Sequence, residues 1–158
     1  MVIIMLNEAE TMTDANREGA AADAAKEYLS FVSDGIHFVV NASNVIEIIM
    51  SHTFTRLPKT PEYIKGIINL RGQIIPIIDV RLKMNKPDMD YGENACIIVV
   101  DVNSTVVGLL VESVSHVVKI NSEDISPVPP KNMQELVSGI ARIGDEVYLM
   151  LDCDLIIT

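Results

Sequence analysis

Three histidines are the side chains of this sequence whose type best suits acid–base or nucleophilic chemistry. His37 and His116 lie inside apolar runs, and His52 lies in the polar stretch "SHTFTR". A hydrolase built from them would need His37 or His116 to meet a serine or cysteine in a cleft. Ser115 precedes His116 directly, but neighbours in a strand point to opposite faces. A catalytic triad is therefore an alternative that the spacing does not favour.

Acidic pairs and cysteines are the other candidates for site chemistry. No pair has a histidine close by in the chain, so each is expected to be a solvated turn rather than a metal site. Neither a glycine-rich phosphate loop nor a metal-type cysteine spacing is present, so no cofactor and no metal is implied. Cys96 and Cys153 are expected to be reduced, buried and hydrophobic in behaviour. The acidic pairs are Asp88 with Asp90, Glu123 with Asp124, and Asp152 with Asp154.

Basic residues cluster between positions 56 and 86, where only Glu62 and Asp79 oppose them. One interpretation is a solvated face that keeps this part of the chain soluble. The other is a positive docking surface for an acidic partner, which would mainly raise the association rate. The basic residues of the cluster are Arg56, Lys59, Lys65, Arg71, Arg81, Lys83 and Lys86.

Composition limits the partners and the kind of core. The 158 residues suit one domain, or two small ones that share a core. Apolar residues make up 49% but aromatic residues only 4%, so the core must be aliphatic, and its many Ile and Val residues favour strands. The net charge of −10 argues against nucleic acid and against anionic membrane surfaces. No apolar run reaches the roughly 20 residues of a membrane span, so no direct membrane insertion and a cytoplasmic location are expected.

Turn signals between apolar runs predict a series of β-hairpins. Nine or ten short strands are expected, which indicates an all-β barrel or sandwich. Gly108 should mark a bulge or a close approach, and Pro76 an edge or a bulge. Residues 41–50 are expected to form a helical turn that leads into a strand. The predicted turns lie at Asp34-Gly35, Arg71-Gly72, Asn103-Ser104 and Gly144-Asp145.

Two further features concern domain organisation. The stretches "GIINLRGQIIPIID" and "GIARIGDEVYLMLD" repeat one pattern of glycine, strand, turn, strand and aspartate, which suggests two related half-units. Residues 1–27 form an acidic, alanine-rich extension, expected to be a frayed tail or a loosely docked helix. Residues 28–158 are expected to form the folded domain.

The sequence resembles the CheW-type chemotaxis coupling proteins. The resemblance rests on "VIEI" (45–48), "PEYIKGIINLRGQIIPIIDVRLKM" (61–84), "CIIVVDVNSTVVGLLVESVSHVVKI" (96–120) and "VSGIARIGDEVYLMLDCDLI" (137–156). It implies an all-β fold of two SH3-like five-stranded barrels, side by side, that share a hydrophobic seam. It also implies a noncatalytic adaptor that couples the cytoplasmic hairpin of methyl-accepting chemoreceptors to the regulatory domain of the histidine kinase CheA, at membrane-associated receptor arrays. The alternative is a CheW-like regulatory module of a larger kinase or receiver-fused protein.

The resemblance also assigns receptor-binding residues, whereas kinase-binding residues cannot be assigned from it. Val45 and Ile48 are expected to be exposed and to bury against an apolar stripe of the receptor. Arg71 is expected to reach carboxylates or carbonyls beside that stripe. In a second interpretation Arg71 only braces Glu47 or Asp79 within the fold. The receptor-binding residues implied are Val45, Glu47, Ile48, Arg71, Val107 and Gly108.

Overall fold

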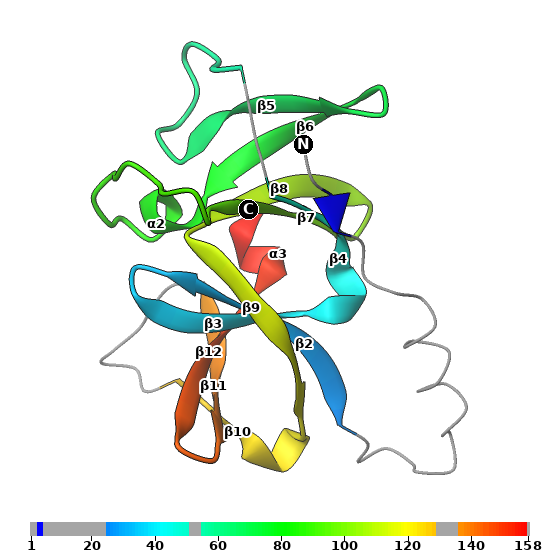
Figure 1. The fold of residues 1–158 in the computed structure, drawn as a ribbon, viewed down its shortest axis with the longest axis vertical. Coiled ribbons are helices and arrows are strands. Elements are labelled where there is room, and N and C mark those ends of the chain that lie inside the picture. The colour runs from blue at the N-terminus through cyan, green and yellow to red at the C-terminus, as the bar shows by residue number, and fades with distance from the viewer. Residues whose placement is uncertain (1–2, 5–24, 51–54, 129–135, 158) are drawn as a thin grey trace.

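A computed structural model describes residues 3–4, 25–50, 55–128 and 136–157. They form two mostly antiparallel sheets of six strands each. Figure 1 shows the two sheets one above the other. Sheet A contains β1 (Ile3–Ile4), β4 (Val45–Ile49), β5 (Ile64–Leu70), β6 (Gln73–Asp79), β7 (Cys96–Val102) and β8 (Thr105–Val111). Sheet B contains β2 (Lys26–Ser33), β3 (Ile36–Asn41), β9 (Ser113–Ile120), β10 (Ile125–Ser126), β11 (Val137–Ile143) and β12 (Glu146–Leu151). The predicted all-β fold is confirmed.

Short helical turns connect the strands. The two 3-10 turns are η2 (Ala42–Asn44) and η3 (Ser122–Asp124), and the two short α-helices are α2 (Val80–Lys83) and α3 (Cys153–Ile156). The predicted turn before the strand at 45–49 is therefore confirmed. Within the described ranges, no helix is both long and apolar enough to cross a membrane.

Apart from the two-residue strands β1 and β10, the two sheets have the same strand arrangement. In sheet A the β5–β6 hairpin lies beside the β7–β8 hairpin, β6 runs parallel to β8, and β4 lies outside β7. In sheet B the β11–β12 hairpin lies beside the β2–β3 hairpin, β12 runs parallel to β3, and β9 lies outside β2. Both hairpins have a register shift before their glycine, between Ile64 and Gly66 and between Val137 and Gly139. The repeated sequence pattern thus corresponds to a repeated structural unit.

All four predicted hairpins are present. In three of them both turn residues have positive φ, the geometry of the type I′ turn that matches strand twist. Pro76 lies opposite Ile67 and one residue before the parallel ladder with β8 begins, so its missing N–H interrupts no pairing with β8.

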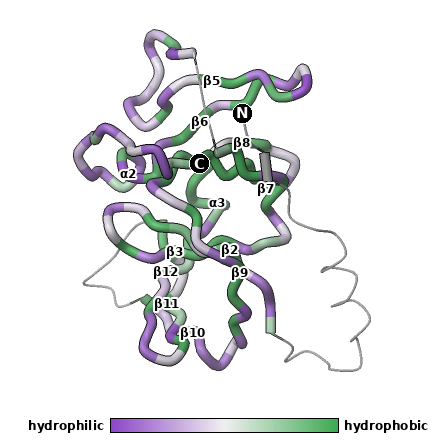
Figure 2. Tube along the Cα trace, in the orientation of Figure 1, coloured by the Kyte–Doolittle hydropathy of each residue, from purple (hydrophilic) through white to green (hydrophobic). Residues whose placement is uncertain are grey.

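A shared hydrophobic core, the seam, joins the two sheets. Phe31 and Phe38 contribute from sheet B, with their rings stacked at 5.6 Å between centroids. Ile98 and Leu109 contribute from sheet A, and all four side chains are fully buried. Figure 2 shows β7 and β8 as largely hydrophobic segments, in contrast to the hydrophilic connections around α2. Each sheet also encloses a smaller apolar cluster of its own.

A charged cluster also connects the two sheets. Arg81 in α2 donates from Nη1 to Asp34 Oδ1, 2.7 Å away at the turn of the β2–β3 hairpin. It also donates from Nη2 to the carbonyl of Pro87 at 2.9 Å. The backbone N–H of Asp34 donates to Glu112, the residue at which the chain passes from sheet A to sheet B. The cluster therefore fixes the point where the two sheets meet.

The amino-terminal extension differs from expectation at its start. Ile3 and Ile4 form a strand that pairs with Ile49 and Ile48 of β4, so this end of the extension adds to sheet A. The predicted tail or docked helix covers residues 1–27: Lys26 and Glu27 belong to β2, and residues 1–2 and 5–24 lie outside the described residues.

Gly108 marks a close approach, as predicted, and not a bulge, because its pairing with Val99 is regular. A Cβ atom there would lie 2.6 Å from Ile77 Cδ1 and 2.7 Å from Ile97 Cγ2. We expect Gly108→Ala to lower the free energy of unfolding by about 1–3 kcal/mol, since inserting a methyl group into a packed core forces neighbours to move. Urea unfolding followed by circular dichroism measures this. Gly92→Ala is the control, because a Cβ there meets nothing within 4 Å, and equal effects of both substitutions would contradict the account.

Candidate protein-docking site

The tip of the β5–β6 hairpin presents Arg71 to solvent. Arg71 and Gly72 are the two turn residues, with φ of 52° and 86°. The left-handed conformation costs little for glycine but is unfavourable for arginine. The Asn69 side chain accepts a hydrogen bond from the Gly72 N–H at 2.9 Å, which stabilises the turn. The turn therefore holds an exposed guanidinium on a short, rigid support.

A fully buried carboxylate anchors that guanidinium. Arg71 Nη1 donates to Glu47 Oε1 at 2.5 Å, while 59% of the Arg71 side chain stays exposed. The hydrogen bond and the charge of Glu47 raise the pKa of Arg71. Glu47 belongs to β4, which lies beside the two-residue edge strand β1, at the far side of the strand order from β5. The ion pair therefore closes sheet A across the gap between its two ends, which is the bracing role considered above.

The other predicted contact residues are buried. Val45 is 9% exposed and Ile48 is 3% exposed, and both side chains pack in the seam. The prediction that they are exposed aliphatic side chains is wrong, because sheet B covers the face of β4 from which they project. Val107 is also buried in the seam, and Gly108 lies against Ile77 and Ile97 inside sheet A. Only Arg71 of the six is available to a partner without rearrangement, and receptor binding by the set stays a prediction.

Exposed aliphatic residues lie elsewhere, and the sequence reasoning missed them. Ile74, on β6 close to Arg71, is 56% exposed, and Val147, on β12, is 46% exposed. The register of the two hairpins makes these positions equivalent, since Ile74 pairs with Asn69 and Val147 with Arg142. Aligning the two repeated stretches in the sequence would have matched the two residues, although not their exposure. Figure 1 shows the two hairpins at opposite ends of the molecule.

Much of the basic cluster serves the fold. Lys65 is buried beside Asp79 and Asp88, and Arg81 forms the inter-sheet cluster with Asp34. Both interpretations of the cluster, solvated face and docking surface, are therefore wrong for Lys65 and Arg81. Three other members also have partners: Arg71 pairs with Glu47, Lys86 with Asp34, and Lys83 lies 3.9 Å from the centre of the Tyr63 ring.

The histidines do not form a catalytic group in the part of the chain that is described. His37 and His116 are both exposed. His37 meets the ring of Tyr148 edge-on, and the backbone of His116 exchanges hydrogen bonds with Ser30 Oγ. His52 lies outside the described residues. Among the described residues no three His, Cys, Asp or Glu side chains group as metal ligands would.

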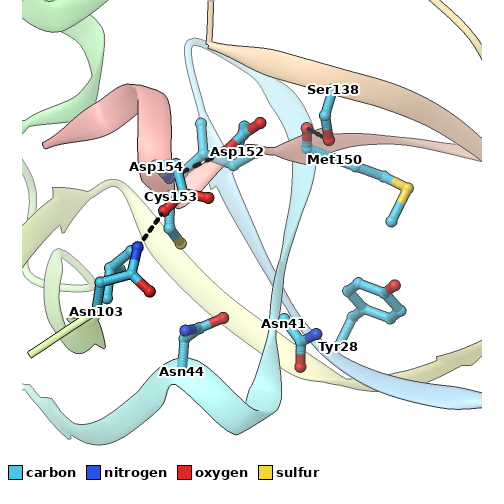
Figure 3. A pocket seen from close by; sticks show the side chains of 11 residues that line it. Tyr28, Asn41, Asn44, Asn103, Ser138, Met150, Asp152, Cys153 and Asp154 are labelled. Carbon is cyan, nitrogen blue, oxygen red and sulfur yellow. Dashed lines mark hydrogen bonds between the residues drawn. The ribbon is translucent and has the colours of Figure 1, made fainter. Parts of the chain in front are cut away.

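A crevice of about 320 Å³ lies where α3 meets β3 and the β7–β8 turn (Figure 3). Two hydrogen bonds join residues that line it: Asn103 Nδ2 donates to Asp154 Oδ1 at 2.9 Å, and the Asp154 N–H donates to Asp152 Oδ1 at 2.9 Å. Asp152 thereby caps the start of α3. The acidic pair at 152 and 154 thus lies at the start of a helix, where the expectation was a solvated turn. Cys153, between the two, is a free, buried thiol.

Burial, together with the charges of Asp152 and Asp154, raises the pKa of the Cys153 thiol from 9.0 to about 12. A thiol whose pKa is higher in the folded state contributes stability that is fully present below its unfolded pKa and is lost as the pH rises through its folded pKa. We therefore expect the difference in unfolding free energy between wild type and Cys153→Ala to fall from about pH 9 upward, by about 1.4 kcal/mol per pH unit. Urea titrations at several pH values measure it, and a constant difference would contradict the account. Tyr148, whose pKa is also raised, is common to both proteins.

Comparison with known proteins identifies the family. Residues 27–158 match the model of the CheW-like domain. The chain belongs to the CheW-like domain family. It is 33% identical to the chemotaxis protein CheW of Klebsiella aerogenes over 138 residues, covering 85% of this chain and 83% of that one. It is 32% identical over 140 residues to the chemotaxis protein CheW of Thermotoga maritima, covering 86% and 91%.

A solved CheW structure has the same fold. The scaffolding protein TtCheW from Thermoanaerobacter tengcongensis superposes with a TM-score of 0.77 and is 31% identical, covering 81% of this chain and 89% of that one. The CheW-like domain therefore spans both sheets, and the predicted SH3-like fold is confirmed. Each sheet has five main strands and one two-residue strand at its edge, β1 or β10.

Proposed function

We propose that this protein is a noncatalytic adaptor that couples the cytoplasmic hairpin of a chemoreceptor to the regulatory domain of the histidine kinase CheA. The match of residues 27–158 to the CheW-like domain carries this proposal, because its relatives are chemotaxis and scaffolding proteins. The protein acts in the cytoplasm, and it joins membrane-associated receptor arrays by binding rather than by insertion. It acts by binding other proteins through its surface, and it catalyses no reaction.

The two exposed hairpins support a role with two partners. The β5–β6 hairpin offers a charged fork and an aliphatic side chain, Arg71 and Ile74, and the β11–β12 hairpin offers Val147. Protein interfaces combine an apolar centre with a polar rim, and we assign the exposed aliphatic side chain of each hairpin to such a centre. Because the hairpins lie at opposite ends of the molecule, one partner can bind without covering the other's surface. We assign the receptor to the surface around Arg71.

Arg71→Ala tests that assignment. We expect binding of a chemoreceptor cytoplasmic hairpin to weaken about tenfold, since arginine at the centre of an interface is a frequent hot spot. Isothermal titration calorimetry gives the affinity, and a thermal melt of the same variant gives the stability. Arg71→Lys keeps the charge but loses the planar fork, so it should recover only part of the binding.

The melt separates the two roles of Arg71. Weakened binding with an unchanged melting temperature identifies a contact residue. A large fall in melting temperature identifies the brace to Glu47 as the main role. Unchanged receptor affinity in both variants would remove Arg71 from the receptor surface.

A further inference from the structure

The two oxygens of the Glu47 carboxylate have different surroundings. Oε1 accepts the hydrogen bond of Arg71, whereas Oε2 is buried and no donor among the described residues reaches it. Nearly all buried polar atoms in native proteins have a hydrogen-bond partner, so an unmatched carboxylate oxygen calls for an explanation. The free acceptor lies directly beside the surface assigned to the receptor.

Arg71 supplies the complementary feature. Its fork carries five N–H donors, and within the described residues only Nη1 forms a hydrogen bond. The ion pair therefore places an unmatched acceptor and unmatched donors side by side at the edge of sheet A.

We infer that Glu47 and Arg71 together form a recognition site for one side-chain amide, asparagine or glutamine, of the docking partner. The amide NH₂ donates to Glu47 Oε2, and the amide carbonyl accepts from the Arg71 fork. This inference rests on the proposed function, because it specifies the chemistry of the partner at the same surface.

Charge selects the amide over other side chains. A partner carboxylate could accept from Arg71 but would be repelled by Glu47. A partner guanidinium or ammonium could donate to Glu47 but would be repelled by Arg71. A neutral amide has one donor and one acceptor at the same end and meets neither repulsion.

The inference requires that Oε2, which is buried in the free protein, becomes accessible when the partner binds. More than half of the Arg71 side chain is exposed, and the residue stands at the tip of a two-residue turn. We expect a tilt of this exposed guanidinium, with Nη1 keeping its bond to Oε1, to open the path to Oε2.

A double-mutant cycle tests the site on the full-length protein. In Glu47→Gln the amide oxygen faces Arg71, so the amide NH₂ group, a donor, takes the place of the acceptor Oε2. The probe is a chemoreceptor cytoplasmic hairpin in which each asparagine or glutamine of the tip is changed to alanine in turn, with affinity measured by calorimetry. We expect one of these changes to weaken binding to wild type about tenfold and to leave binding to Glu47→Gln unaltered. Glu112→Gln, which alters a carboxylate of the inter-sheet cluster, should keep the full sensitivity.

The cycle has outcomes that overturn the inference. Equal sensitivity of wild type and Glu47→Gln to every amide change would do so. So would coupling of Glu47 to a charged residue of the receptor tip in place of an amide.

A second measurement does not depend on the receptor or on the folding of a variant. Acetamide, acetate and guanidinium chloride are titrated separately into the wild-type protein, and the carbon signal of the Glu47 carboxylate and the Arg71 Nε signal are followed by NMR. Acetamide alone should shift both signals in a saturable way. The inference is overturned if acetamide gives no such response, for example because an ordered water already fills the site. It is also overturned if acetamide, acetate and guanidinium chloride all give the same response. If the receptor hairpin fails to bind wild type at all, the proposed function fails, and the acetamide titration still decides the inference.

Discussion

Replacing Asp79 with alanine should lower the free energy of unfolding by about 3–5 kcal/mol, as expected when one partner of a buried charged network is removed. Asp79 is fully buried at the end of β6. Its Oδ1 accepts hydrogen bonds from the Tyr91 hydroxyl at 2.8 Å and from the Leu82 N–H at 3.2 Å. Its Oδ2 lies 3.8 Å from Lys65 Nζ. The substitution leaves the tyrosine hydroxyl and the first turn of α2 without an acceptor, so two elements lose their anchor together.

The repeated unit supplies a matched control. Asp152 comes directly after β12, whereas Asp79 is the last residue of β6, and Asp152 caps α3 by accepting a hydrogen bond from the Asp154 N–H. Asp152 is only partly buried, so Asp152→Ala should cost about 1 kcal/mol, the usual value of a helix cap. Thermal and urea unfolding, followed by circular dichroism, compare the two variants. Equal losses would show that the burial and partners of Asp79 do not set its effect.

Replacing Phe38 with alanine should cost a similar amount, about 3–5 kcal/mol, since it opens a large cavity in the seam. The Phe38 ring is fully buried and stacks on Phe31 at an interplanar angle of 14°. Because the seam is built from both sheets, the loss should destabilise both sheets together and keep a single unfolding transition.

Hydrogen exchange measured strand by strand distinguishes a shared core from two independent ones. In Phe38→Ala the most protected amides of β7 in sheet A and of β2 in sheet B should lose protection by the same factor. Loss confined to sheet B would mean that the sheets fold separately. Ile74→Ala, at an exposed position, should change stability by no more than about 0.5 kcal/mol.

The hairpins could be predicted from sequence because their turns are local. Asp34-Gly35, Arg71-Gly72 and Asn103-Ser104 each stand between two apolar runs, and the turn conformation depends on few residues. For Gly108 the sequence predicted a bulge or a close approach, since a glycine inside an apolar strand indicates either one, and only the structure shows that it is the close approach. The strand Ile3–Ile4 was not, because a two-residue strand has no periodicity and exists only through its pairing with β4.

The exposure of β4 could not be predicted from the stretch "VIEII". A continuous apolar run gives no alternation from which an inward and an outward face can be assigned. The register shift between Val45 and Glu47 also breaks the simple alternation of sides along the strand. Whether a face is buried depends on the second sheet, which is assembled from residues distant in the chain. Burial of Val45 and Ile48 therefore followed only from the tertiary structure.

The pairing of Arg71 with Glu47 was among the predicted alternatives, and it shows how one residue can serve both the fold and a surface. Glu47 holds the guanidinium in place, while the exposed part of the side chain remains available. A brace and a contact are thus compatible, and the affinity and stability of the Arg71 variants measure them separately.

Simultaneous binding of both partners tests the central proposal most directly. The full-length protein is mixed with a chemoreceptor cytoplasmic hairpin and the CheA regulatory domain, singly and together, and the complexes are sized by chromatography with light scattering. An adaptor should bind each partner alone and form a ternary complex that contains all three. If the two partners displace one another, or if neither binds, the protein does not couple a receptor to the kinase.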